Sequence, residues 1–223
     1  MADDDGDRLL ARLAGVETSS LVDAAGGALR VLPAALLPIR PGLDLAGRAL
    51  TVDARDDLVP VLEGLRRAGP GDVLVVAGNQ QHAVAGELFA TEALRRGLAG
   101  IVLDGLCRDS RALAELDLPV YARGVVPTAC PARALPVVQV PILVGDVEVR
   151  PGDLLRGDAD GVVVGSEDEV RAVLDAAEAI QHREDGLRAA IAAGASLFDS
   201  LNYEEHLAAL RDGRPSRLTF DDV

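Results

Sequence analysis

The sequence predicts an α/β fold built around a parallel βαβ unit. The segments 73–77 (VLVVA) and 99–105 (AGIVLDG) are as apolar as buried strands, and 83–97 between them has the spacing of an amphipathic helix that ends on a glycine. Two such strands joined by a helix should lie parallel, with a right-handed crossover, so the loops after both strands meet at one edge of the sheet. Ligands usually bind at that edge in α/β proteins.

Further helices and strands are expected on both sides of this unit. Apolar spacing predicts helices over 7–15, 19–26, 56–68, 167–193 and 202–211. Short apolar or alternating segments predict strands over 46–54, 119–124, 135–140, 141–145, 147–158 and 161–165. Ser19 or Ser20 is the expected N-cap of the second helix.

The segments outside these elements are expected to be irregular. Residues 1–6 are predicted to form a disordered tail and 212–223 a C-terminal tail, and 31–41 contains three prolines. No repeat of domain size and no linker divides the chain, so residues 1–223 are predicted to form a single domain.

Composition excludes several classes of function. The chain has 22 basic and 36 acidic residues and a net charge of −14, which argues against nucleic acid as a partner. All the basic residues are arginine. Because a Schiff base and a phosphate-binding P-loop both need lysine, imine-forming aldolases, pyridoxal enzymes and P-loop nucleotide hydrolases are excluded.

Cysteine and histidine give weaker indications. Cys107 and Cys130 form no CxxC pair and are interpreted as small apolar residues of a reduced, cytoplasmic protein. The acidic N-terminus and the absence of an apolar run of membrane-spanning length argue against a signal peptide and a membrane location. His182 and His206 are expected to be solvated, and His82, on the loop after a strand, is more easily explained as a loop residue than as a catalytic base.

Charged residues follow the second strand of the βαβ unit. Asp104, Arg108 and Asp109 are expected at the ligand-binding edge, where a guanidinium can hold a carboxylate with two hydrogen bonds. Asp109 can supply an oxygen to Mg²⁺, which needs only one or two protein carboxylates. The alternative is an Arg–Asp ion pair that organises a turn and caps the next helix.

The start of the crossover helix should face these residues across adjacent strand ends. Free backbone N–H groups at residues 86–89 (GELF) could bind an anion, supported by the helix dipole; the alternative is a helix start with a glycine at a packing contact. A carboxylate held between these N–H groups and Arg108, beside a metal ion on Asp109, fits a small 2-oxo acid.

The segment from Gly86 to Asp109, GELFATEALRRGLAGIVLDGLCRD, resembles the core signature of the RraA-like family. The resemblance covers roughly residues 15–200, including 120–124 (VYARG), 147–164 and the helix that carries HRED. This family contains class II 4-hydroxy-4-methyl-2-oxoglutarate aldolases and the regulator of ribonuclease activity A. The resemblance implies a swivelling β/β/α fold and assembly into trimers or paired trimers.

Site residues follow from the resemblance. It assigns substrate contacts to Gly86, Glu87, Leu88 and Phe89, the substrate carboxylate to Arg108, and the metal ion to Asp109. Glu87 stands where aldolase-active members carry aspartate, so the charge is kept and the side chain is longer. The family's proposed acid comes from a neighbouring subunit, and Glu204 or Glu205 is the candidate here.

The sequence therefore predicts a Mg²⁺- or Mn²⁺-dependent pyruvate aldolase that also decarboxylates oxaloacetate, with Glu87, Arg108 and Asp109 as catalytic residues. The metal ion is expected to act as a Lewis acid while Arg108 stabilises the developing charge. The alternative is a non-catalytic regulator that binds ribonuclease E, a partner whose arginine-rich surface would suit an acidic protein. A phosphohistidine carrier is disfavoured, since His82 lies in no phosphate-accepting turn.

Overall fold

A nine-stranded mixed sheet forms the centre of the protein, and the computed structural model describes residues 2–220 of the chain. Its strands follow the order β1-β11-β10-β3-β4-β6-β7-β2, and β5 pairs with the end of β6. Their bounds are β1 Arg30–Val31, β2 Leu37–Pro38, β3 Leu45–Asp53, β4 Asp72–Ala77, β5 Ala83–Ala85, β6 Gly100–Cys107, β7 Val120–Val125, β10 Leu154–Gly157 and β11 Val162–Gly165. A separate hairpin joins β8 (Ile142–Val144) to β9 (Val147–Val149).

The four strands β3, β4, β6 and β7 run parallel to one another in the middle of the sheet. Val73 is aligned with Gly100 and Ala77 with Asp104, so the predicted parallel βαβ unit is confirmed. The loops after these four strands therefore meet at one edge of the sheet. The remaining strands are antiparallel, apart from β5.

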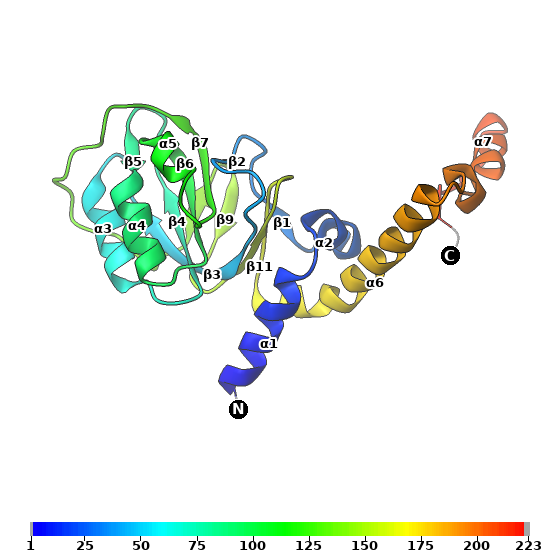
Figure 1. The fold of residues 1–223 in the computed structure, drawn as a ribbon, viewed down its shortest axis with the longest axis horizontal. Coiled ribbons are helices and arrows are strands. Elements are labelled where there is room, and N and C mark those ends of the chain that lie inside the picture. Colours follow the sequence, from blue (N-terminus) through cyan, green and yellow to red (C-terminus); the bar gives the residue numbers. More distant parts are fainter. Residues whose placement is uncertain (1, 221–223) are drawn as a thin grey trace.

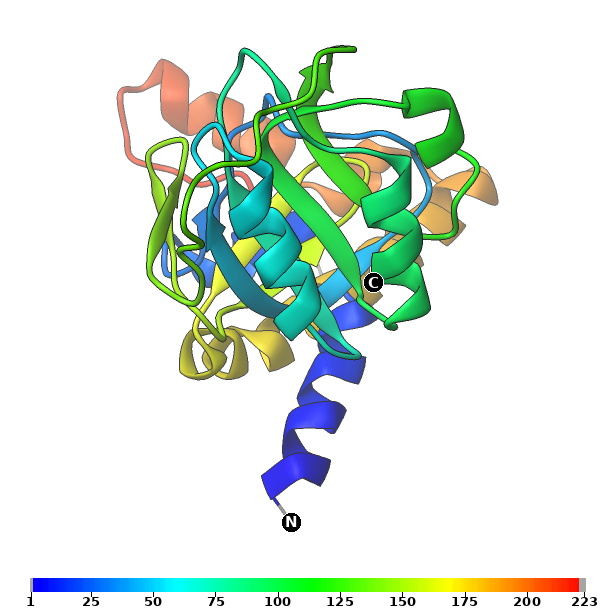
Figure 2. The same ribbon diagram turned by 90° about the vertical axis from the view of Figure 1, so that its left-hand side faces the viewer.

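Helices cover the sheet in two groups. Their bounds are α1 Ala2–Ala14, α2 Thr18–Ala25, α3 Leu58–Arg67, α4 Glu87–Arg95, α5 Ser110–Leu113, α6 Glu167–Ala192 and α7 Tyr203–Arg211, with a 3₁₀ turn at Leu197–Ser200. Helices α3 and α4 lie side by side on one face, where they share a core with β3, β4 and β6 (Figure 2). Helices α1, α2 and α6 pack together near β10 and β11, at the other end of the sheet (Figure 1).

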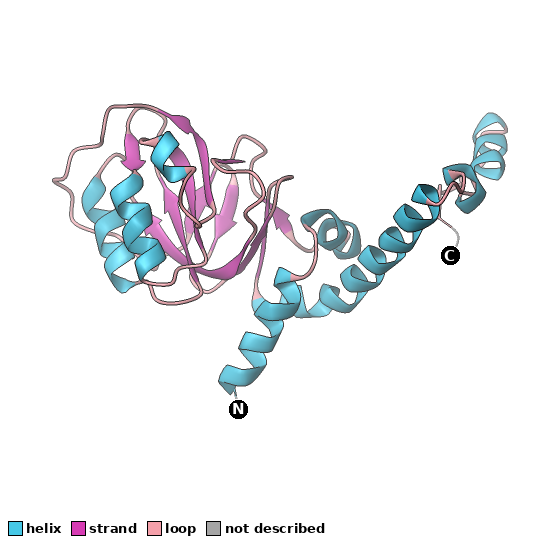
Figure 3. Cartoon of the chain, in the orientation of Figure 1, coloured by secondary structure: helices cyan, strands magenta, loops and turns pink. Residues whose placement is uncertain are grey.

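The second half of α6, the 3₁₀ turn and α7 project from the body as an arm (Figures 1 and 3). The arm carries exposed apolar side chains: Ile191, Leu197, Phe198, Tyr203 and Leu210. The predicted C-terminal tail folds back onto it as far as the structure describes, because Asn202 accepts a hydrogen bond from the Thr219 backbone at 2.9 Å. Such an apolar surface on a projecting element is typical of a subunit contact.

The predicted helix over 83–97 starts four residues later than expected. Residues 83–85 form β5 instead, with Ala83 aligned with Leu106 and Ala85 with Cys107. Pairing with β6 overrides the helical spacing, and Gly86 then serves as the extended N-cap of α4. This β5–α4 junction lies beside the end of β6, at the edge where the sequence predicts ligand binding.

The predicted strand over 135–140 is wrong. Only Val138 makes a bridge, to Val52, while Leu135 is 87% exposed. Gln139 has a φ of 57°, in the left-handed region that a strand cannot continue through, and Pro136 has no N–H to donate. The segment is a loop that lies beside the last residues of β3, where the Asp53 N–H donates to the Val137 carbonyl and the Gln139 N–H to the Thr51 carbonyl.

The N-terminal region is more ordered than predicted. Helix α1 begins at Ala2, so residues 2–6 are helical, and Asp5 is tied to Arg171 of α6 by an ion pair of 3.0 Å. The N-cap of α2 is Glu17, and neither predicted serine caps it. Asp158 replaces a local cap, since its carboxylate accepts from the N–H and the hydroxyl of Thr18, each at 2.8 Å.

Across residues 2–220, none of the helices combines the length and the apolar character that a membrane span requires. The α/β prediction is confirmed by the mixed sheet and its helices. The assignment of all 223 residues to one domain stays a prediction.

Candidate functional site

Arg108 and Asp109 leave the end of β6 at the parallel edge of the sheet. The backbone N–H of Arg108 donates to the Ala85 carbonyl at 3.0 Å, which fixes the start of this turn against β5. Asp109 has φ 58° and ψ 36°, a left-handed conformation that costs a residue other than glycine about 1 kcal/mol. The strain is smallest for aspartate and asparagine, and such conformations often mark functional sites.

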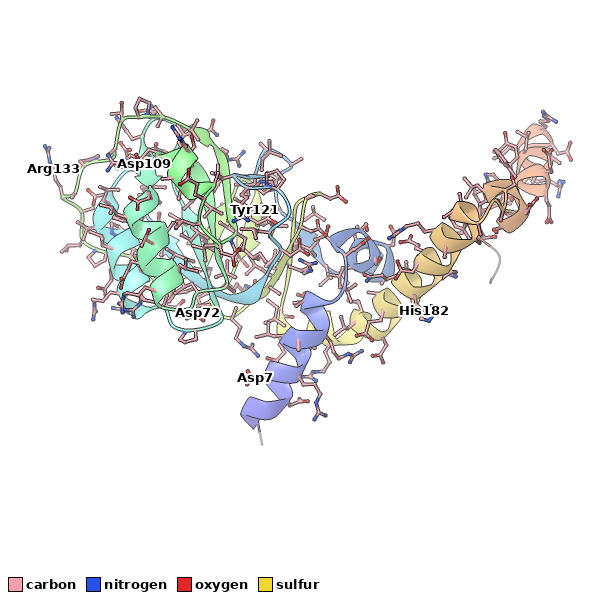
Figure 4. The ribbon with its side chains drawn as sticks, in the orientation of Figure 1. Asp7, Asp72, Asp109, Tyr121, Arg133 and His182 are labelled. Atoms are coloured by element: carbon pink, nitrogen blue, oxygen red, sulfur yellow. The ribbon has the colours of Figure 1, made fainter. Side chains whose placement is uncertain are left out.

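A hollow of about 730 Å³ opens beside these two residues. Its lining comes from α5, the turn before it and the end of β7: Arg108, Asp109, Ser110, Arg111, Ala112, Glu115, Val125, Val126 and Pro127. The side chains of Arg108 and Asp109 are 43% and 46% exposed, so a ligand can reach both. Figure 4 places Asp109 at the end of the body where α4 and α5 begin.

The start of α4 lies directly against this pair. The Glu87 backbone N–H donates a long hydrogen bond, 3.4 Å, to Oδ2 of Asp109. The two segments that the sequence predicts to face each other are therefore in contact. The first turn of α4 directs its N–H groups and positive dipole end towards the Asp109 carboxylate.

Gly86 makes this close approach possible. A Cβ at Gly86 would lie 2.6 Å from Oδ2 of Asp109 and 2.9 Å from Cγ of Arg108. Its backbone is extended, so the requirement for glycine is the space beside the pair rather than an unusual φ.

Gly86→Ala is expected to displace Arg108 and Asp109 and to leave the fold intact. Because misplacing catalytic groups by about 1 Å costs on the order of 100-fold in activity, kcat/KM for the predicted aldolase reaction is expected to fall by that amount. Gly69→Ala is the matched control, because a Cβ there would meet nothing within 4 Å. Thermal melting of both variants should match the parent. Wild-type kinetics in Gly86→Ala would show that activity does not depend on the close approach of residue 86 to Arg108 and Asp109.

The structure meets only part of the alternative, in which Arg108 and Asp109 form an ion pair that organises a turn and caps the next helix. Nε of Arg108 lies 3.4 Å from Oδ2 of Asp109, which is long for a charge-assisted hydrogen bond. Asp109 occupies the N-cap position of α5, yet its side chain makes no capping hydrogen bond. The carboxylate thus faces Glu87 and the hollow instead of the helix that follows it.

Asp104 does not lie where the sequence predicts it. Strand β6 continues to Cys107, so Asp104 sits within the strand. Its carboxylate pairs with Arg123 of β7 and accepts from the Gly145 N–H at 2.6 Å. Asp104 and Arg123 are only 13% and 16% exposed, so this pair joins β6, β7 and the β8–β9 turn inside the protein.

The side chains of residues 87–89 point in different directions. Glu87 accepts a hydrogen bond from Thr91 on its own helix at 3.3 Å, and Leu88 is 70% exposed. Phe89 packs against the core under α3 and α4, so its side chain supports the helix. Their roles in substrate binding stay predictions.

Sequence reasoning missed a second group of side chains at the same edge. His82 contacts Asp56 at 2.8 Å, and Cys130 contacts the same carboxylate at 3.2 Å. The three residues of this group, Asp56, His82 and Cys130, come from different loops, and only their positions after parallel strands could have suggested it.

The other two histidines lie far along the chain from this group. His182 is exposed on α6, as predicted, and His206 lies on α7.

Comparison with known proteins now decides the family. Residues 18–164 match the family model RraA-like, described as Aldolase/RraA. The chain belongs to the RraA-like family. A relative from Halalkalibacterium halodurans, named "Putative 4-hydroxy-4-methyl-2-oxoglutarate aldolase", is 36% identical over 179 residues, which covers 79% of this chain and 85% of the relative. A relative of the same name from Burkholderia mallei is 36% identical over 157 residues, or 67% of this chain and 95% of the relative.

Solved RraA-like structures share the fold. The RNA-processing inhibitor RraA from Thermus thermophilis matches with a TM-score of 0.62 and 31% identity, over 66% of this chain and 91% of that one. Streptomyces coelicolor RraAS2, described as an unusual member of the RNase ES inhibitor RraA protein family, has a TM-score of 0.71 and 28% identity over 81% and 96%. The predicted resemblance and the RraA-like fold are therefore confirmed.

Proposed function

We propose that this protein is a divalent-metal-dependent, class II pyruvate aldolase. It cleaves 4-hydroxy-2-oxo acids such as 4-hydroxy-4-methyl-2-oxoglutarate and decarboxylates oxaloacetate as a side activity. The observation that carries the proposal is that Arg108 and Asp109 line one accessible hollow while the start of α4 contacts Asp109 from beside it. The names of the aldolase-like relatives support the same chemistry.

The residues at the hollow fit a hard divalent cation. Asp109 offers an exposed carboxylate, and Mg²⁺ or Mn²⁺ takes oxygen ligands and keeps several waters beside one or two protein carboxylates. The hollow, about 730 Å³, has room for hydrated metal and a small acid. A bound Mg²⁺ would supply a Lewis acid for the 2-oxo group of the substrate.

The chain's own groups would bind and orient the substrate. The Arg108 guanidinium can hold the substrate carboxylate in a bidentate contact and places positive charge where negative charge grows as the C–C bond breaks. Glu87, at the first position of α4, can hold or move a proton beside the reacting carbon. The absence of lysine supports this chemistry over an imine mechanism.

Pyruvate release tests the proposal directly. Protein stripped with EDTA is incubated with a panel of 4-hydroxy-2-oxo acids and with oxaloacetate, without metal and with Mg²⁺ or Mn²⁺. Metal-dependent pyruvate formation is expected from at least one 4-hydroxy-2-oxo acid and from oxaloacetate. Folded protein that releases no pyruvate from any member of the panel, or equal activity in EDTA, contradicts the proposal.

A non-catalytic regulator of ribonuclease E is the second candidate. It is favoured by the solved relatives described as inhibitors of RNA processing and of RNase ES, and the net charge of −14 suits a basic protein partner. Inhibition of ribonuclease E at stoichiometric concentrations, unchanged in a variant that lacks Arg108, would support this role.

The arm suggests that the site is completed by a neighbouring subunit. Phe198 and Leu210 are 62% and 55% exposed on the arm, and Glu204 and Glu205 line a second hollow beside Phe198. Within one chain the arm projects away from Asp109 (Figures 1 and 4). We therefore infer a homotrimer or hexamer in which the arm of one subunit covers a neighbour and excludes water from the reacting carbon.

Subunit mixing tests the shared site. Arg108→Ala subunits and Glu204→Ala/Glu205→Ala subunits should each be inactive alone. Exchange of subunits should restore partial activity, because some subunit interfaces then combine an intact Arg108 with an intact Glu204 and Glu205. Light scattering should give a trimer or a hexamer. A fully active monomer would refute the shared site, and failure to recover activity after proven exchange would remove the two glutamates from the mechanism.

A further inference from the structure

A histidine, a cysteine and an aspartate meet at the same sheet edge as the proposed aldolase site, outside its lining. Asp56 follows β3, His82 ends the loop between β4 and β5, and Cys130 lies beyond β7. Their ligand atoms all lie within 4.8 Å of one another. In the part of the chain that the structure describes, no other group of three such side chains has this geometry.

The Asp56 carboxylate connects the other two side chains. Its Oδ1 lies 2.8 Å from Nδ1 of His82 and 3.2 Å from Sγ of Cys130. Hydrogen bonds from Asn79, His82 and Cys130 lower the pKa of Asp56, so it carries a negative charge at neutral pH.

The backbone holds the three loops together before any ligand arrives. The Cys130 N–H donates to the Ala83 carbonyl at 3.0 Å, which places the cysteine beside the residue that follows His82. The His82 N–H donates to the side chain of Asn79 at 3.2 Å. These bonds place two of the three ligands on ordered backbone, so little conformational entropy remains to be lost on binding.

The loop that carries Asp56 is fixed by its neighbour. The buried carboxylate of Asp57 accepts from the N–H groups of Arg133 and Ala134 at 2.7 and 3.0 Å. The Leu58 N–H donates to the Pro131 carbonyl at 2.8 Å. The residues that directly follow Asp56 are thus bonded to those that follow Cys130, which holds the two side chains at a set separation.

A nucleophilic role for Cys130 does not fit these contacts. Its thiol donates to a carboxylate instead of facing the imidazole, and burial together with Asp56 raises the pKa of Cys130 to about 12. A thiol in that state is a poor nucleophile. A metal ion can still replace the thiol proton, because coordination favours the thiolate.

We propose that Asp56, His82 and Cys130 form a binding site for a zinc-type transition-metal ion, separate from the site at Asp109. The set of one thiolate, one imidazole and one carboxylate suits Zn²⁺ better than Mg²⁺, which prefers oxygen ligands alone. Tetrahedral zinc needs ligand atoms about 3.4–3.6 Å apart, as its bond lengths require. The observed 2.8 and 3.2 Å contacts have to open by less than 1 Å to admit the ion.

The site keeps one position open to solvent. Cys130 is 6% exposed, while the side chains of His82 and Asp56 are 32% and 43% exposed. Three protein ligands with solvent on one side leave the fourth position to water or a small anion. The ion would tie together the loops after β3, β4 and β7, which lie close to one another at this edge.

Cobalt substitution tests the site, because Co²⁺ bound to a thiolate gives a charge-transfer band that oxygen ligands do not give. EDTA-stripped full-length protein is titrated with Co²⁺ and then with Zn²⁺. The band should appear at one equivalent per chain and disappear as Zn²⁺ displaces Co²⁺. Zn²⁺ should also raise the melting temperature of the stripped protein.

Variants assign the ligands. Cys130→Ser should remove the band, and His82→Gln should weaken Zn²⁺ binding by at least about ten-fold, the lower end of what losing even a supporting partner costs. The matched controls are Cys107→Ala and His182→Gln, which should leave both readouts unchanged. Asp109→Asn should keep the band as well, which separates this site from the aldolase proposal.

Two results would overturn the proposal. One is a wild-type protein that gives no thiolate band with Co²⁺ and no shift in melting temperature with Zn²⁺. The other is a band that persists in Cys130→Ser or disappears equally in Cys107→Ala. Circular dichroism confirms that each variant is folded before its metal binding is compared, and His82→Gln gives an independent answer if Cys130→Ser does not fold.

Discussion

Asp109→Asn is expected to abolish metal-dependent pyruvate release, with kcat/KM falling on the order of 100-fold or more. The change removes the charge that would hold the divalent cation, and a Lewis acid supplies several kcal/mol of transition-state stabilisation. Asparagine tolerates the left-handed backbone at φ 58° almost as well as aspartate. The variant therefore tests the carboxylate and not the turn, which alanine would also disturb.

Metal titration of the EDTA-stripped protein measures this effect. Wild type should lose activity in EDTA and recover it with Mg²⁺ or Mn²⁺, whereas Asp109→Asn should stay inactive at the concentrations that restore the wild type. Asp117→Asn is the matched control, because its side chain is 83% exposed. Full rescue of Asp109→Asn at wild-type metal concentrations would assign the metal to another group.

Arg108→Lys is expected to lose about 2–4 kcal/mol of transition-state stabilisation although the positive charge is kept. Lysine has no planar fork, so it cannot make the bidentate contact to the substrate carboxylate. The corresponding loss in kcat/KM is roughly 30- to 1,000-fold. The guanidinium is 43% exposed beside the hollow, so the stability of the fold should change little.

Steady-state kinetics and thermal melting distinguish a binding role for Arg108 from a structural one. Arg95→Lys is the control, because Arg95 is exposed and pairs with Glu92 on its own helix at 2.6 Å. It should match the parent in both measurements. If Arg108→Lys unfolds the protein, the Arg108–Asp109 pair is a structural ion pair. If its kinetics are unchanged, Arg108 does not hold the substrate.

The sequence predicted the elements whose cause is local. The two apolar strands, the main part of the helix between them and the glycine after its last turn follow patterns of at most fifteen consecutive residues, and all are present in the structure. The same patterns predicted that the second strand ends shortly before Arg108. They therefore placed Arg108 and Asp109 at the edge where ligand binding is expected. The absence of lysine likewise limits the available chemistry whatever the fold is.

Features that depend on a distant partner were not predictable. Residues 83–85 have helical spacing, yet they form a strand because β6 offers them hydrogen-bond partners. Thr18 needs no local cap because Asp158, 140 positions away, accepts its hydrogen bonds. Asp104 was expected at the ligand site, and pairing with Arg123 on the adjacent strand holds it within the sheet.

The two candidate sites differ in the same way. By itself the sequence determined that residues 86–89 and Arg108–Asp109 face each other, since one helix crossover between parallel strands separates them. Only the tertiary structure brought Asp56 to His82, 26 positions away, and to Cys130, 74 positions away. Periodicity reports which face of an element is buried and where it ends, whereas strand order and the paths of loops decide which distant side chains meet, because both result from the packing of the whole chain.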